Sequence, residues 1–241
     1  MRPFMIAITG GSGSGKSTLA NAFLEKAGDA LCAVIGEDNY YKPRSEHAEP
    51  VVGVSLDEVE RRINFDDTTS KDMAAMKADF AALKRGDAID QPVYSFADHD
   101  RIAGECVHID PRPIVIVEGI HVLSQPDIAD LFDLKVFVDT PADLRLARRI
   151  KRDIIPKSEG GRGRDPDRVI SQYLQFVRAS HQRVTEPSKF ICDLVIADEG
   201  LPAYRETTAE PSDRAVSRML TPLMHRVMME RPGLLPDTLS F

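Results

Sequence analysis

The sequence contains few cysteines and no long apolar segment. No hydrophobic run approaches the roughly 20 residues of a membrane-spanning helix. The apolar N-terminal run continues into glycines, without the small-residue cleavage pattern of a signal peptide. Cys32, Cys106 and Cys192 are widely spaced and form no CxxC pair, which argues against a disulfide framework and a structural zinc site. We therefore expect a cytoplasmic protein without a membrane segment, whose cysteines are small core residues.

The chain also has more acidic than basic residues. Its 241 residues include 38 Asp and Glu against 31 Lys and Arg, a formal net charge of −7. Affinity for nucleic acid comes largely from neutralising phosphates with basic residues, so this balance disfavours nucleic acid as a partner. The basic residues are unevenly placed, and one short stretch contains Arg145, Arg148, Arg149, Lys151, Arg152, Arg162, Arg164 and Arg168. That local concentration requires its own explanation.

Hydrophobic periodicity predicts alternating strands and helices, the pattern of a parallel α/β sheet. Strands are expected at Phe4–Thr9, 30–36, 114–117, 134–138 and 194–196. Helices are expected at Lys16–Ala27, 56–63, 71–84, 141–153, 165–185 and 213–229. Residues 91–108 are predicted to form a hairpin or an extended excursion, and 156–163, with a proline and three glycines, a mobile loop. No internal repeat or interdomain linker is present.

Residues 10–17, Gly-Gly-Ser-Gly-Ser-Gly-Lys-Ser, match the phosphate-loop pattern GxxxxGK[ST] in full. The loop follows a predicted strand and opens a predicted helix, which is the context that the motif requires. Glycines allow positive φ angles and close approach of a ligand, and successive N–H groups form a nest for an anion. Lys16 is expected to reach the β and γ phosphates and the Ser17 hydroxyl to bind Mg²⁺. The expected nucleotide-binding residues are Gly10, Gly11, Ser12, Gly13, Ser14, Gly15, Lys16, Ser17 and Thr18.

A phosphate loop alone does not distinguish GTPases, transporter ATPases and kinases. The chain lacks the NKxD tetrapeptide that reads guanine and has no LSGGQ-like segment. The 114–117 strand ends in a single acid, Glu118, followed by Gly119, where many water-activating ATPases have paired acids. These features favour a kinase. Glu118 is a candidate ligand for Mg²⁺, either directly or through a water.

Asp38 follows the second predicted strand. Ligands of an open parallel sheet bind beyond the C-terminal ends of its strands, so this carboxylate could accept the proton of an acceptor hydroxyl. Phosphoryl transfer needs mainly positioning, charge neutralisation and one such general base. An aspartate that only forms the turn after the strand explains this segment equally well.

Several segments together resemble the uridine kinase (uridine–cytidine kinase) family over about residues 4–200. They are GGSGSGKST at 10–18, DNYYK at 38–42, NFDD at 64–67, PVYSFADHDR at 92–101, IVIVEGIHVL at 114–123, VFVDTPADLRLARRIKRD at 136–153, RGRD at 162–165, ISQYLQFV at 170–177 and EPSKFICDLVI at 186–196. Phosphoribulokinases and pantothenate kinases are wider relatives. The resemblance implies a P-loop NTPase-like parallel five-stranded sheet flanked by helices. A kinase domain, 1–200, would include a hairpin excursion at about 88–110 and a lid at about 153–165, and 201–241 would be a C-terminal helical extension of the same domain.

The resemblance also implies an activity, which is Mg²⁺-dependent phosphorylation of the 5′-hydroxyl of uridine or cytidine by ATP or GTP. Asp38 would be the base, and Lys16, Arg152 and Arg162 would neutralise the transferring phosphate. The magnesium positions would be Ser17, Asp38 and Glu118. The nucleoside contacts would be Tyr41, Asp66, Tyr94, Phe96, His99, Arg149, Arg164 and Gln172. Family members also suggest a homo-oligomer, a tetramer.

The residues by themselves leave other interpretations open. Tyr94 and Phe96 could be one face of a strand packed on the core, and His99 a surface histidine. Arg145, Arg149 and Arg152 share a helical face that could simply be solvated. The acceptor could be another metabolite, such as ribulose 5-phosphate or pantothenate, or the chain could be an ATP-binding regulatory module without transfer.

The sequence departs from the family pattern at two places. Asp67 stands where the family commonly has His-Pro, and the segment 154–161 is several residues longer than the usual lid connection. The closing motion of such a lid is therefore an open question. After about Gly200 the resemblance fades, and the C-terminal helix has no expected role beyond packing or subunit contact.

Overall fold

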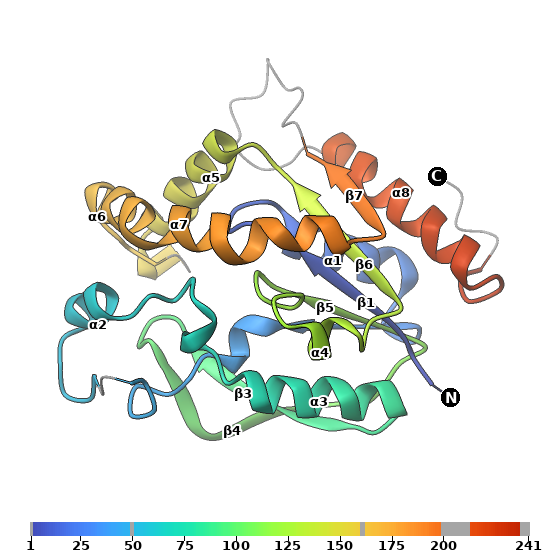
Figure 1. Cartoon of the computed structure of the whole chain (residues 1–241), viewed down its shortest axis with the longest axis horizontal. Helices are drawn as coiled ribbons and strands as arrows, with labels where there is room; N and C mark the ends of the chain where they lie inside the picture. The colour runs from blue at the N-terminus through green and yellow to red at the C-terminus, as the bar shows by residue number, and fades with distance from the viewer. Residues whose placement is uncertain (1, 49–50, 160–161, 199–212, 237–241) are drawn as a thin grey trace.

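The centre of the molecule is a five-stranded parallel sheet of order β2-β5-β1-β6-β7 (Figure 1). The strands are β1 Phe4–Thr9, β2 Cys32–Gly36, β5 Ile114–Glu118, β6 Leu134–Asp139 and β7 Leu194–Ala197. The computed structural model describes residues 2–48, 51–159, 162–198 and 213–236. The predicted fold class is confirmed. Residues 160–161 of the expected lid, and 201–212 and 237–241 of the expected extension, lie outside the described residues.

Both faces of the sheet are covered by helices, and β1 is therefore buried along its whole length. Phe4, Ile6 and Ile8 belong to one core, together with residues of α1 (Lys16–Ala27) and α8 (Asp213–Glu230). Met5 and Ala7 belong to the opposite core, together with α3 (Met73–Arg85) and α4 (Pro126–Ala129). The alternation follows from the two-residue period of a strand. It explains why the apolar run near the N-terminus shows no polar positions.

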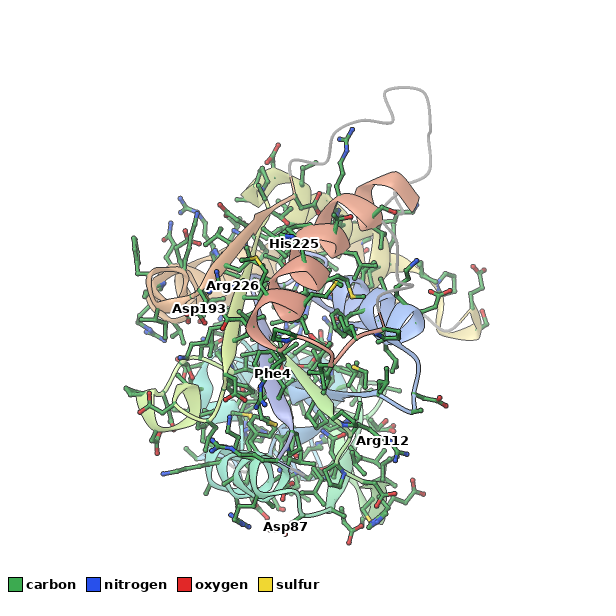
Figure 2. The ribbon with its side chains drawn as sticks, turned by 90° about the vertical axis from the view of Figure 1, so that its right-hand side faces the viewer. Phe4, Asp87, Arg112, Asp193, His225 and Arg226 are labelled. Atoms are coloured by element: carbon green, nitrogen blue, oxygen red, sulfur yellow. The ribbon has the colours of Figure 1, made fainter. Side chains whose placement is uncertain are left out.

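The C-terminal helix α8 is part of the packed fold. Met219, Leu223, Met224 and Val227 are buried in the same core as Phe23 of α1. Figure 2 looks onto this helix, with His225 and Arg226 labelled on it. None of the helices in the described ranges is both long and apolar enough to cross a membrane.

The predicted hairpin forms a separate two-stranded antiparallel sheet of β3 (Ile89–Ser95) and β4 (Asp100–Ile109). Most of β4 is exposed on both faces, and Cys106 is exposed with it. The expectation that all the cysteines are core residues is therefore wrong for Cys106, because this strand lies outside the main sheet and only its last residue, Ile109, packs on a core. Cys32 is buried and Cys192 is half-buried.

The remaining helices largely follow the predicted pattern. They are α2 Leu56–Arg62, α5 Ala142–Ile154, α6 Pro166–Gln172 and α7 Arg178–Ser180, with short turns at Glu37–Tyr40, Thr68–Ser70, Lys157–Glu159 and Glu186–Ile191. The predicted helix 165–185 is a composite, since α6 and α7 are each followed by a π-helical segment, Tyr173–Val177 and His181–Thr185. The single turn α4 was not predicted, because four residues show no helical period.

The predicted helix 71–84 begins two residues late, at Met73. Asp72 is its N-cap, and the Asp72 side chain accepts a hydrogen bond from the N–H of Ala75. Lys71 is therefore not helical. It is extended and forms an antiparallel β-bridge with Tyr41. This difference directs the Lys71 side chain to the site described below.

The packing of the α3 core can be tested at Phe80, which is fully buried. Its ring makes edge contacts with Tyr40 and Phe132, at 5.7 and 6.0 Å between centroids. Phe80→Ala should lower the free energy of unfolding by about 3–5 kcal/mol, because a cavity remains. Phe190→Ala is the control, since that ring is 87% exposed and its loss should cost less than about 0.5 kcal/mol. Urea denaturation measures both, and equal losses would contradict this account of the core.

Candidate active site

A cavity lies beyond the C-terminal ends of β1, β2 and β5. Lys16 and Ser17 follow β1, Asp38 follows β2 and Ile120 follows β5, and all of them line it. All the expected catalytic residues and nucleoside contacts line the same cavity. The lining residues are Ser12, Lys16, Ser17, Asp38, Tyr41, Phe65, Asp66, Tyr94, Phe96, His99, Ile120, Arg149, Arg152, Arg162, Arg164 and Gln172. Of the other expected residues, Glu118 and the remaining phosphate-loop residues are not among them, nor is Thr18, which is half-buried on the first turn of α1. The phosphate-loop residues concerned are Gly10, Gly11, Gly13, Ser14 and Gly15.

The phosphate loop is held tightly against the segment that follows β6. Gly10, Gly13 and Gly15 have φ values of 149°, 83° and 90°, which favour glycine. A Cβ on Gly13 would lie 2.5 Å from the carbonyl oxygen of Arg145. The loop also folds on itself, since Ser14 N–H donates to the carbonyl of Gly11 over 2.9 Å. At Gly13 only a residue without a side chain fits this path.

Helix α1 starts from this loop with an open N-terminus. Gly15 is the N-cap, and no side chain in the described parts of the chain caps the helix. The first N–H groups of a helix have no partner within the helix and carry part of its dipole. They are therefore available to an anion such as a phosphate group.

Ser17 and Glu118 meet beside the loop, where the Ser17 hydroxyl donates to Oε1 of Glu118 over 3.0 Å. Burial raises the pKa of Glu118 above its ordinary value, although Lys16 and Ser17 act in the opposite direction. A nearby cation would stabilise the charged form of this carboxylate. Hydroxyl and carboxylate oxygens are the ligands that Mg²⁺ prefers, so the residues fit that ion.

Asp38 is held by a lysine that the sequence analysis did not single out. Nζ of Lys71 lies 2.8 Å from Oδ1 of Asp38, and the Asp38 side chain remains about half exposed. Burial acts to raise the pKa of Asp38. The attraction of Lys71, with smaller contributions from Lys16 and Arg162, outweighs it and holds this pKa well below its usual value. Asp38 is therefore ionised at neutral pH.

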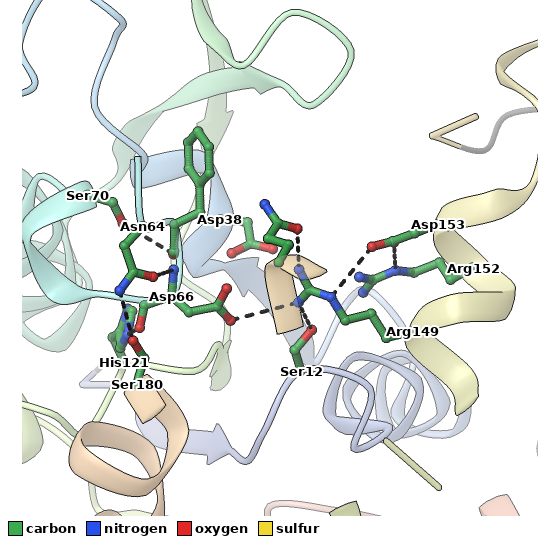
Figure 3. A network of polar contacts seen from close by, with 12 residues as sticks. Ser12, Asp38, Asn64, Asp66, Ser70, His121, Arg149, Arg152, Asp153 and Ser180 are labelled. Atoms are coloured by element: carbon green, nitrogen blue, oxygen red, sulfur yellow. Dashed lines mark hydrogen bonds and ion pairs between the residues drawn. The ribbon is translucent and has the colours of Figure 1, made fainter. Parts of the chain in front are cut away.

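The clustered arginines are organised by one buried carboxylate, Asp153, at the end of α5 (Figure 3). Its oxygens lie 2.8 Å from Arg152 Nε, 3.3 Å from Arg162 Nη1 and 3.3 Å from Arg164 Nη1. Burial, together with the like charge of Arg152, lowers the pKa of Arg162 to about 10, so this side chain remains a cation at neutral pH. The alternative of a merely solvated arginine face is wrong for Arg149, which is buried.

Arg149 connects the phosphate loop with the other side of the cavity (Figure 3). Its guanidinium donates to the Ser12 hydroxyl over 3.1 Å and to Oε1 of Gln172 over 2.9 Å. It also lies 3.8 Å from the carboxylate of Asp66. The position links the two ends of the cavity.

Aromatic rings form one wall of the cavity. Tyr41 packs against Tyr94 with 5.0 Å between ring centroids, and Phe96 lies 5.4 Å from Tyr94. The Tyr94 hydroxyl is buried and has no hydrogen-bond partner among the described residues. Tyr94 and Phe96 thus face the cavity, and they are not one face of a strand packed on the main core. The wall suits a flat ring with a polar edge.

His99 is buried in the turn between β3 and β4 and is not a surface residue. It has a φ of 53°, a left-handed conformation that is uncommon for a residue other than glycine. Its ring stacks on Phe65 at 4.9 Å, and its Nε2 lies 2.8 Å from Oε1 of Glu60. Glu60 also contacts Arg164 Nη2 over 2.7 Å. One glutamate of α2 therefore joins the hairpin to the arginine cluster.

Sequence reasoning missed several residues that complete the site. Lys71, Glu60 and Asp153 hold the expected side chains, and Phe65 and Ile120 line the cavity. Phe65 and Ile120 lie inside two segments that carry the family resemblance, 64–67 and 114–123, so position was an available signal. Lys71 and Glu60 stood in predicted helices with no motif of their own, and nothing in their local sequence marks them.

A family model described as the phosphoribulokinase / uridine kinase family matches residues 5–201. The uridine kinase of Clostridium perfringens (strain SM101 / Type A) is 39% identical over 199 residues, which cover 83% of this chain and 89% of that protein. The uridine kinase of Clostridium botulinum (strain Okra / Type B1) is 40% identical over 200 residues, covering 83% and 90%.

Solved structures share the fold at much lower identity. Phosphoribulokinase from Rhodobacter spheroides is 16% identical with a TM-score of 0.61, over 95% of this chain and 98% of that one. A structure described as a possible uridine kinase from Bacillus stearothermophilus is also 16% identical, with a TM-score of 0.54, over 81% and 89%. At such identities the likeness concerns the fold alone.

The path of the phosphate loop can be tested with two glycines that share a positive φ. Gly13 and Gly28 have φ values of 83° and 85°, but a Cβ on Gly28 meets nothing within 4 Å. Alanine at either position should cost about 1–3 kcal/mol of stability from backbone strain. Only Gly13→Ala should also weaken binding of a non-hydrolysable ATP analogue, by at least about tenfold, or 1.4 kcal/mol. Calorimetric titration measures this, and equal affinities in the two variants would refute the assignment of the loop.

Proposed function

The chain belongs to the phosphoribulokinase / uridine kinase family, and on this basis we propose that it transfers the γ-phosphoryl group of ATP to the 5′-hydroxyl of uridine or cytidine. The observation that carries the proposal is one cavity in which a phosphate loop, an ionised aspartate and an aromatic wall converge. Membership of the family, which the motifs indicated, makes the chain a P-loop kinase. What we propose beyond this is the acceptor, a pyrimidine nucleoside.

The nucleoside is proposed to lie between the aromatic wall and Asp66. Tyr94 and Phe96 would contact the flat pyrimidine, with His99 near its polar edge. The Asp66 carboxylate, held near Arg149, would accept hydrogen bonds from the ribose hydroxyls. A second phosphate, as on a sugar phosphate acceptor, would find aromatic rings on this side of the cavity. This favours a nucleoside over the phosphorylated alternatives.

In the transfer, the 5′-oxygen forms a bond to the γ-phosphorus while the bond from that phosphorus to the bridging oxygen breaks, and ADP leaves. Asp38 accepts the proton of the hydroxyl. Its low pKa makes it a weak base, which is adequate because phosphoryl transfer depends mainly on positioning and on charge neutralisation. Lys16, Arg152 and Arg162 are proposed to neutralise the charge on the transferring group.

The residues proposed to hold Mg²⁺ are Ser17 and Glu118, with Asp38 as a third oxygen donor in the same cavity. Bound there, the ion would neutralise charge on the phosphates and orient them. The protein side chains position the ion and both substrates.

The acceptor can be identified by a coupled assay of ADP release. We expect turnover with uridine or cytidine at a kcat/KM far above that with ribulose 5-phosphate or pantothenate, because the aromatic wall suits a base. Absence of turnover with both pyrimidine nucleosides would reject the substrate assignment. ATP binding without ADP release for any acceptor would favour a regulatory module. Exchange of ATP for GTP in the same assay identifies the donor.

Asp38→Asn tests the base. The change keeps the shape and removes the proton acceptor, so kcat should fall by about 10²- to 10⁴-fold. The dissociation constant of ATP should stay within about threefold, which is less than 1 kcal/mol. Asp87→Asn is the matched control, since this carboxylate is exposed and is not among the residues that line the cavity. Figure 2 shows Asp87 at the opposite end of the molecule from α8. Near-normal turnover of Asp38→Asn would refute the assignment.

A further inference from the structure

Lys71 is a completely buried cation whose charge faces the proposed base. Its side chain is 0% exposed. Its ammonium group donates to Oδ1 of Asp38 over 2.8 Å and to the Glu37 carbonyl over 3.3 Å. It also forms an ion pair with Oε1 of Glu37, at 3.2 Å. The ring of Tyr41 lies on another side, with its centroid 3.4 Å from Nζ. A buried ammonium group is costly unless it is paired, so these partners determine where it lies.

The backbone of Lys71 is also held in place. Lys71 forms an isolated β-bridge with Tyr41. On either side of it, Lys42 N–H donates to the Ser70 carbonyl over 2.9 Å and Asp72 N–H donates to the Tyr40 carbonyl over 2.8 Å. The segment that follows Asp38 is therefore tied directly to the residues on either side of Lys71. The lysine approaches the aspartate from a rigid frame.

Glu37 forms the other side of this arrangement and is itself fully buried. Its Oε2 accepts a hydrogen bond from the N–H of His121 over 2.7 Å, and a Cβ on Gly119 would overlap its carboxylate. Nε2 of His121 donates to the carbonyl of Asp66 over 3.0 Å. A continuous chain of contacts thus runs from Asp38 through Lys71, Glu37 and His121 to Asp66. It joins the two acids proposed to contact the hydroxyls of the nucleoside.

We propose that Lys71 is a positioning residue for phosphoryl transfer, which holds one carboxylate oxygen of Asp38 so that the other faces the acceptor hydroxyl. The inference rests on the role proposed above for Asp38. The exposed fractions of the two side chains support this role. The Lys71 side chain is inaccessible to solvent, whereas the Asp38 side chain is 51% exposed and lines the cavity. Without the lysine the carboxylate can rotate about its side-chain bonds. An error of about 1 Å in such a group can cost about 100-fold in rate.

A purely structural role is the competing explanation, in which Lys71 serves only as the counter-charge of Glu37. The distances favour positioning, since Lys71 is closer to Asp38 than to the Glu37 carboxylate. The two roles separate when Glu37 is first made neutral. In a Glu37→Gln background there is no buried carboxylate at position 37 for the lysine to balance. A further effect of removing Lys71 then comes from Asp38, or from the Glu37 carbonyl and the Tyr41 ring, which Lys71 also contacts.

The experiment compares Glu37→Gln with Glu37→Gln/Lys71→Met, using the best acceptor of the wild-type protein. We expect kcat of the double variant to be about 10- to 100-fold below that of the single variant. KM for the nucleoside and the dissociation constant of ATP should remain within about threefold, because the lysine touches neither ligand. Glu37→Gln/Lys71→Gln is a second version, with a polar side chain, should the methionine variant not fold. Equal kcat values for the single and double variants would overturn the proposal.

Removal of Lys71 in an Asp38→Asn background completes a double-mutant cycle between these two residues. If Lys71 acts through Asp38, its removal there should lower the residual kcat no further. An equal fall in both backgrounds would instead indicate a general structural role. A crystal structure of the double variant should show the Asp38 carboxylate turned away from its wild-type position, and an unchanged carboxylate would contradict the inference. If the wild-type protein turns over no pyrimidine nucleoside, only the proposed function is rejected. The position of the Asp38 carboxylate in the crystal structure still tests the role of Lys71.

Discussion

The pairing of buried carboxylates with cations is the interaction on which this site depends. Four arginines surround Asp153, and one lysine lies between Glu37 and Asp38. Like charges so close together would repel one another strongly in a medium of low dielectric constant. Each cluster is stable because it contains an opposite charge. A site for a polyanion and an ionised base can therefore exist side by side.

Such buried pairs contribute more to geometry than to stability. Removing two charges from water costs several kcal/mol per ion, which their attraction only repays when the geometry is good and further hydrogen bonds are made. Here each charged group has additional partners, such as the His121 N–H on Glu37 and the Gln172 amide on Arg149. These extra contacts restrict the side chains to one arrangement. Preorganised charges of this kind are what phosphoryl transfer requires.

The partners in these clusters come from distant parts of the chain. Glu37 follows β2, Lys71 precedes α3 and His121 follows β5, so the network forms only when α3 has packed on the assembled sheet. The hairpin and α2 join the arginines in the same way, through His99, Glu60 and Arg164. The site is thus a product of tertiary structure, although each expected ligand contact belongs to a short motif.

The sequence by itself determined the class of fold and most of the residues that line the cavity. Strand and helix periods, the phosphate loop and the family motifs are local patterns, and they placed Asp38, Ser17 and the aromatic residues where the structure brings them together. Only the tertiary structure decided which residues hold them in place. Lys71 is an example: the periodic pattern predicted that it belongs to a helix, but Asp72 caps that helix and Lys71 forms a β-bridge instead. The physical reason is that a buried charge is defined by its partners in space. Those partners lie more than 30 residues away along the chain, where no local pattern records them.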